Sequence, residues 1–155
     1  MYIVRGNVVD ALLNKEIDFL LHCCNAQGKY ASGIAGEIRQ KIPTAYNVYM
    51  NSINTIPESK CLGTISVEKG VVNIIGQKYY GYAGMRYVNY GALAKAFNDL
   101  FYVVQDYSLK QPKDISIGIP HLIGHGLAGG DKLVIMELIE HCLCSWCDNV
   151  ILYKI

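Results

Sequence analysis

The chain has 155 residues, 52% of them hydrophobic and 17% charged, and its 14 Lys and Arg against 13 Asp and Glu give a net charge of +1. This length fits one domain of the usual ~100–200 residues, and no linker, repeat or low-complexity tract offers a boundary, so we expect a single domain over 1–155. The charge balance argues against a dedicated electrostatic nucleic-acid binder, and the hydrophobic content argues against disorder.

The predicted elements of the first half alternate between strands and helices. Residues 2–5 indicate a short strand, and the continuous apolar run at 17–24 is typical of a strand covered on both faces. Apolar side chains at helical spacing predict a helix over 33–42. A second short helix follows at 44–53, with Thr44 as its expected N-cap.

The second half begins with a predicted β-hairpin formed by 62–68 and 71–77. A Tyr- and Gly-rich segment at 78–90 shows no period and indicates an ordered surface loop, whereas 91–107 carries the apolar stripe of a core-facing helix. The order is completed by a strand at 115–119, a Gly-rich loop at 120–130, a helix at 132–147 and a strand at 150–153. This alternation predicts an α/β domain with a mixed sheet between helices.

Two of the predicted strands end in a Gly-rich loop that leads into a helix, at 22–35 and at 119–131. Glycine lets the backbone come close to a ligand, and a helix N-terminus offers free N–H groups to an anion. In an open α/β sheet, the loops at the carboxyl ends of strands surround the usual ligand crevice. The pair therefore suits a pyrophosphate, although strand-to-helix turns that need glycine only for their geometry give the same pattern. Neither loop is a Walker A, since no Gly-Lys-Ser or Gly-Lys-Thr occurs in them.

The six cysteines fit reduced, buried thiols better than a disulfide framework, because Cys23 and Cys24 are adjacent and the chain is rich in core residues. Cys144 and Cys147 form one CxxC pair, whereas a structural zinc needs four ligands, so we expect no metal. No run approaches the ~18 apolar residues of a membrane span, and the first residues do not resemble a signal peptide. We expect a cytoplasmic protein with no membrane partner.

Several motifs together resemble those of macrodomains, which bind ADP-ribose. They are Gly6-Asn7-Val8 at the opening, His22-Cys23-Cys24-Asn25 and Ser32-Gly33-Ile34-Ala35 around the first loop, and Gly124-His125-Gly126-Leu127-Ala128-Gly129 in the second. The resemblance runs from the first strand to the last. It is closest to the ADP-ribose 1''-phosphate phosphatase branch, whose strand end reads His-x-Cys-Asn, and to phage-borne macrodomains. It implies a macrodomain-like three-layer α/β/α sandwich with a mixed, mostly parallel central sheet.

The same resemblance implies a hydrolase without a cofactor that converts ADP-ribose 1''-phosphate to ADP-ribose and phosphate. Its partner is then a small-molecule ADP-ribose derivative, with nucleic acid expected only as an ADP-ribosylated substrate. A cytoplasmic monomer is expected, in the host cytoplasm if a phage encodes it. Two alternatives stay open: hydrolysis of ADP-ribose esters, such as O-acetyl-ADP-ribose or ADP-ribosylated protein or nucleic acid, and a non-catalytic ADP-ribose reader.

The implied ligand-binding residues follow the motifs by position. Asn7 and Val8 are expected near the adenine. The side-chain carbonyl of Asn7, where many relatives have Asp, is expected to accept a hydrogen bond from the adenine amino group. The alternative is an Asn that only closes a turn. Asn25 is expected at the distal ribose, a position where Asn is also a common turn former. The diphosphate and ribose are expected along Ser32, Gly33, Ile34 and Ala35 and along Gly124, His125, Gly126, Leu127 and Ala128.

The implied catalytic residues are His22, Asn25 and Asp131. His22 ends an apolar strand where the phosphatase branch has its catalytic His, and it is expected to act as an acid or base, or to attack phosphorus itself. A single His on an apolar strand is otherwise a satisfied core residue. Asp131 either caps the helix that follows it or orients His22 or a water.

Overall fold

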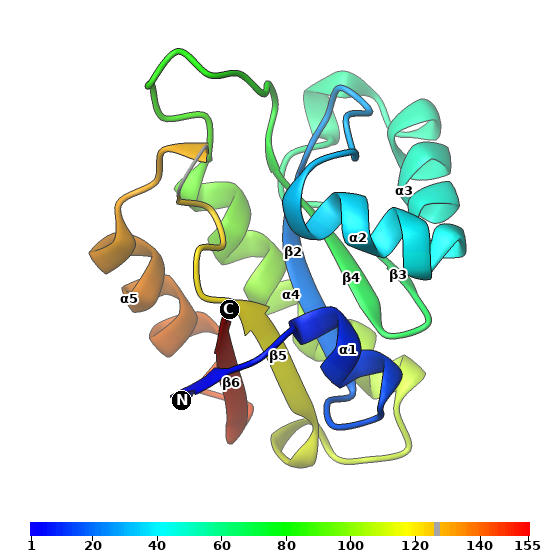
Figure 1. Ribbon diagram of the computed structural model, residues 1–155, viewed down its shortest axis with the longest axis vertical. Helices are drawn as coiled ribbons and strands as arrows, with labels where there is room; N and C mark the ends of the chain where they lie inside the picture. The colour runs from blue at the N-terminus through cyan, green and yellow to red at the C-terminus, as the bar shows by residue number, and fades with distance from the viewer. Residues whose placement is uncertain (126–127) are drawn as a thin grey trace.

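The computed structural model describes residues 1–125 and 128–155 and contains one six-stranded sheet. Its strands lie in the order β1-β6-β5-β2-β4-β3 (Figure 1). Their bounds are β1 Tyr2–Arg5, β2 Phe19–Asn25, β3 Ile65–Glu68, β4 Val71–Gln77, β5 Ser116–Pro120 and β6 Asn149–Lys154. Every neighbouring pair is parallel except the β3–β4 hairpin. The sheet is therefore mixed and mostly parallel, as predicted.

Helices cover both faces of this sheet, with α1 and α2 in front of it and α4 behind it in Figure 1. The helices are α1 Val8–Leu13, α2 Gly33–Lys41, α3 Pro43–Thr55, α4 Tyr90–Tyr107 and α5 Lys132–Cys142, with short 3₁₀ turns at Glu58–Lys60 and Pro112–Asp114. One apolar core joins the sheet to α4 and α5, and a second joins it to α1, α2 and α3. This arrangement confirms the predicted three-layer α/β/α sandwich. Among the described residues, no helix has both the length and the apolar character needed to cross a bilayer.

Strand β2 lies near the centre of the sheet and its side chains alternate between the two cores, as the period of a strand requires. Leu21 belongs to the core under α4 and α5, whereas Leu20 and Cys24 belong to the core under α1, α2 and α3. His22 falls in the same alternating set as Leu20 and Cys24, so its imidazole faces the layer of α2 and α3. The direction of this one side chain decides much of the chemistry below.

The structure adds one helix that was not predicted and corrects two predictions about local structure. Helix α1 was not predicted, although Asn7 followed by a short apolar stretch is a helix start: Asn7 Oδ1 accepts from the N–H groups of Val9 and Asp10 at 2.8 and 3.0 Å. The last helix ends at Cys142 instead of 147, because the chain turns there to enter β6. Thr44 is not an N-cap, because α3 begins at Pro43 and Ile42 holds the cap position.

The Thr44 hydroxyl has no hydrogen-bond partner among the described residues, and its oxygen is buried. A buried hydroxyl without a partner costs about 1–3 kcal/mol of desolvation. We therefore expect Thr44→Val to raise the free energy of unfolding by about 1 kcal/mol, measured by urea denaturation. Thr44→Ser keeps the hydroxyl and removes a methyl group, so it should be no more stable than wild type; a stabilised Ser variant would contradict this explanation.

Candidate functional site

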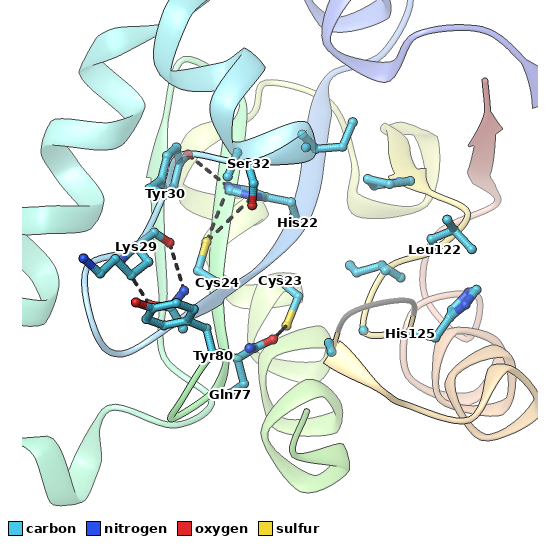
Figure 2. A pocket seen from close by; sticks show the side chains of 18 of the residues that line it. His22, Cys23, Cys24, Lys29, Tyr30, Ser32, Gln77, Tyr80, Leu122 and His125 are labelled. Atoms are coloured by element: carbon cyan, nitrogen blue, oxygen red, sulfur yellow. Dashed lines mark hydrogen bonds between the residues drawn. The ribbon is translucent and has the colours of Figure 1, made fainter. Parts of the chain in front are cut away.

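A cavity of about 520 Å³ lies at the carboxyl ends of β2, β4 and β5. Its walls are the end of β2, the segment 29–35 that leads into α2, Gln77 with 80–82 at and after the end of β4, and Pro120, 122–125 and Ala128 at and after the end of β5. Figure 2 shows His22 and Tyr30 on one side and His125 with Leu122 on the other. Both predicted Gly-rich loops therefore line one cavity. None of the described residues that line it carries a carboxylate, so its electrostatics favour an anion.

The N-terminus of α2 opens onto this cavity. Ser32 holds the N-cap position with an extended backbone, and its hydroxyl makes no capping hydrogen bond. The first N–H groups of a helix have no intrahelical acceptor, and Gly33, Ile34 and Ala35, which carry them, all line the cavity. Gly33 has a φ of +57°, and a Cβ placed on it would meet nothing within 4 Å. This turn can therefore receive a phosphate through backbone donors.

The second loop is anchored from behind by the 85–88 segment. Ala128 O accepts from the N–H groups of Tyr87 and Val88 at 2.8 and 3.1 Å. Gly130 N donates to Gly124 O at 2.9 Å, and a Cβ on Gly130 would clash with that carbonyl. Glycine is thus required there by close backbone packing. The expected ligand residues Gly126 and Leu127 lie outside the described residues.

His22 is 3% exposed and belongs to a buried polar cluster. Its Nε2 lies 2.7 Å from Asn73 Oδ1 and 3.0 Å from the Tyr30 hydroxyl, which itself donates to Asn73 Oδ1 at 2.7 Å. The His22 and Tyr30 rings meet edge to face at 5.1 Å. Burial lowers the pKa of His22 to about 4, against a smaller upward effect of the Asn73 hydrogen bond. At neutral pH the resting imidazole is uncharged, which fits a proton acceptor or nucleophile at the start of a reaction.

Asn25 lines the cavity, but its amide is occupied by the loop that follows β2. Its Oδ1 accepts from the N–H groups of Gln27 and Lys29 at 3.0 and 3.2 Å, and its Nδ2 donates to Lys29 O at 2.9 Å. The Tyr49 hydroxyl donates to the backbone carbonyl of Asn25 at 2.6 Å. The side chain therefore shapes the loop, and its Nδ2 carries a second N–H, for which the described residues provide no acceptor.

The two cysteines at the end of β2 are inert. Burial raises the pKa of the Cys23 thiol to about 12, and burial together with the neighbouring Cys23 raises the pKa of Cys24 well above its usual value. Both remain protonated at neutral pH, and the thiolate is the nucleophilic form of cysteine. They serve as small packing groups on either side of the strand.

Three of the predicted site residues are not brought to this cavity. Asp131 caps α5, and its Oδ1 accepts from the N–H groups of Leu133 and Val134 at 2.8 and 3.2 Å. Val8 is a core residue with 1% exposure. Asn7 caps α1 and donates from Nδ2 to both carboxylate oxygens of Glu37 at 2.8 Å. The Asn7 and Asp131 side chains are used locally as helix caps, so we give neither a role in the chemistry below.

The sequence analysis did not identify several residues that the structure brings to the site. Tyr30 and Asn73 form the cluster around His22, and Gln77, Tyr80 and Tyr82 line the cavity. Asn73 carried a signal, since it is a polar residue in the interior of a mostly apolar buried strand, and such a side chain must find partners in the core. Tyr80 and Tyr82 carried a signal too, since they belong to the Tyr-rich segment 78–90.

No protein-family model matches the chain, and no curated protein matches it. Several solved structures, however, are similar to this chain over nearly its whole length. The macrodomain of Thermus aquaticus DarG superposes with a TM-score of 0.74 at 19% identity, covering 100% of this chain and 99% of that one. A macrodomain protein from Streptomyces coelicolor gives 0.68 at 23% identity, over 99% and 97% of the two chains. Thermosipho africanus DarTG in complex with ADP-ribose gives 0.72 at 12% identity, over 97% of this chain and 40% of that one. The chain therefore has the macrodomain fold.

Proposed function

We propose that the chain binds the ADP-ribose group in this cavity and hydrolyses ADP-ribose 1''-phosphate to ADP-ribose and inorganic phosphate. The observation that supports it most directly is the cavity itself, where both Gly-rich loops meet and no described lining residue is acidic. The match of the fold to a DarTG protein that was solved with ADP-ribose adds support. We place the diphosphate between the α2 N-terminus and the second loop, since backbone N–H groups hold phosphates well.

For the reaction we assign His22 the role of base. Its neutral imidazole accepts a proton from a water while the water oxygen bonds to phosphorus and the bond between phosphorus and the 1'' oxygen breaks. The proton then passes to the ribose oxygen that leaves. The partial positive charge at the α2 N-terminus lies beside the diphosphate in this placement and favours binding of the anionic ligand. The low pKa of His22 leaves the ring uncharged before the reaction at neutral pH, so it starts as a base, and the protonated ring then returns the proton to the leaving oxygen.

Phosphate release from ADP-ribose 1''-phosphate tests this proposal. We expect turnover by the wild type and a loss of about 10²–10⁴-fold in His22→Ala, the usual contribution of a general base. His141→Ala is the matched control, because His141 is an exposed residue of α5 paired with Glu137 and lies outside the cavity. A His22→Ala enzyme that releases phosphate at the wild-type rate would refute the assigned role.

A non-catalytic reader of ADP-ribose is the second candidate, and a specific observation favours it. The side chains of His22, Asn25 and Asp131, predicted to be catalytic, are all bonded within the protein. Calorimetry with ADP-ribose, followed by turnover assays on the 1''-phosphate, on O-acetyl-ADP-ribose and on ADP-ribosylated protein, separates the candidates. Binding without turnover of any substrate supports the reader, and release of acetate or ADP-ribose in place of phosphate supports the ester hydrolase.

A further inference from the structure

We propose that Asn73 is a positioning residue, which fixes His22 in the tautomer with its proton on Nε2 and its lone pair on Nδ1. The inference rests on the proposed function, because it says which atom of His22 is free to accept a proton there. It is carried by hydrogen bonds on three elements: His22 is in β2, Asn73 is in β4, and Tyr30 is in the loop before α2. His22 and Asn73 are directly paired in the parallel register of β2 and β4.

The orientation of the Asn73 amide is set from its far side. Asn73 is 0% exposed, and its Nδ2 donates to the backbone carbonyl of Ala45 at 3.1 Å and to the Ser66 hydroxyl at 3.2 Å. A backbone carbonyl can only accept a hydrogen bond. The NH₂ group must therefore face Ala45, and the amide oxygen must face His22.

The amide oxygen then decides the state of the imidazole. Asn73 Oδ1 has no proton, and it lies 2.7 Å from His22 Nε2, so the proton of that hydrogen bond belongs to Nε2. The opposite tautomer would set two acceptors against each other in a buried site, at a cost of about 1–3 kcal/mol. The Tyr30 hydroxyl donates to the second lone pair of the same oxygen at 2.7 Å, so its proton does not compete for Nε2.

Nδ1 is left as the basic atom of the ring. Among the described residues its hydrogen-bonding contact is the Cys24 sulfur, which lies 3.7 Å from Nδ1 and 3.5 Å from Nε2, and a thiol is a weak donor. His22 is among the residues that line the cavity, and the base assigned above is therefore its Nδ1 atom. Tyr30 contacts His22 and also lines the cavity. Asn73 contacts His22 but does not line the cavity, so it acts on the chemistry only through His22.

The tautomer is measured directly by ¹⁵N NMR of the histidine side chains at pH 7. In the wild type we expect His22 to show a protonated Nε2 and an unprotonated Nδ1, with its signals identified by their loss in His22→Gln. Asn73→Leu should lose this pure pattern, and phosphate release should fall about 10- to 100-fold, as is usual for groups that orient a functional side chain. Ser66→Ala is the matched control, because it removes one acceptor from Nδ2 and leaves Oδ1 untouched, so both readouts should stay at wild-type values.

The wild-type spectrum is decisive even if Asn73→Leu does not fold. A proton on Nδ1 in the wild type would overturn the inference, and so would a folded Asn73→Leu protein with the wild-type pattern. A correct pattern combined with the absence of phosphate release from the wild type would count against the proposed phosphatase activity alone. The spectrum therefore tests the tautomer, and the assay tests the phosphatase activity, independently of each other.

Discussion

Gly33→Glu is expected to weaken ADP-ribose binding at least about a hundredfold in isothermal titration calorimetry, which corresponds to about 2.7 kcal/mol. Gly33 is the first residue of α2 and lines the cavity, and the space beyond its Cα is open. A glutamate there would place a side chain in the volume assigned to the diphosphate. Its carboxylate would also take up the free N–H groups of the helix and repel the ligand's charge.

Gly84→Glu is the control for this experiment. Gly84 has a φ of +73°, close to the +57° of Gly33, and a Cβ on it would likewise meet nothing within 4 Å. It lies in the loop after β4 and does not line the cavity. Both variants therefore carry the same added charge and a similar backbone strain of about 1–2 kcal/mol, while only one obstructs the proposed site. Equal binding by the two variants would show that the diphosphate does not sit at the α2 N-terminus.

The layers of the fold could be predicted because the signals for them are local. Continuous apolar runs such as 71–77 mark buried strands, and the stripe on 91–107 marks a helix that packs on a sheet. The pairing of the two Gly-rich loops also followed from local information, since the carboxyl ends of parallel strands share one edge. Both loops line the cavity, as that rule requires.

The state of each polar side chain could not be predicted in the same way. Asn7 and Asp131 are each followed by apolar helices, and whether such a residue caps its helix or faces a ligand depends on what fills the space beside it. His22 and Asn73 are 51 residues apart and meet only because β2 and β4 pair in one particular register. A shift of that register by one residue would reverse the faces and separate them. Motif position thus pointed to the two loops that line the cavity, whereas the hydrogen-bond partner of His22 came from the pairing of β2 with β4.

Acidification from pH 7 to pH 4.5 is expected to remove about 2 kcal/mol of stability through His22 alone. The native pKa of His22 is lowered to about 4 from its ordinary value of 6.5, because burial penalises the charged ring. Between these two values the unfolded chain binds a proton that the native protein does not. The stabilisation that His22 contributes to the native state is therefore fully present above pH 6.5. It decreases as the pH falls from 6.5 to about 4, and below about pH 4 it no longer changes.

The free energy of unfolding, measured by urea denaturation from pH 7.5 to pH 4.5 in wild type and His22→Gln, isolates this effect. The variant lacks the titrating ring but keeps every other ionisable group, so the difference between the two curves reports His22 alone. We expect the two curves to converge as the pH falls. The wild type loses the stability that depends on the neutral His22 ring, whereas the variant has no such ring and keeps its stability. His141→Gln, which removes an exposed histidine, should run parallel to the wild type. Parallel curves for wild type and His22→Gln would mean that the imidazole is open to solvent, and the neutral base in the cavity would then have no physical origin.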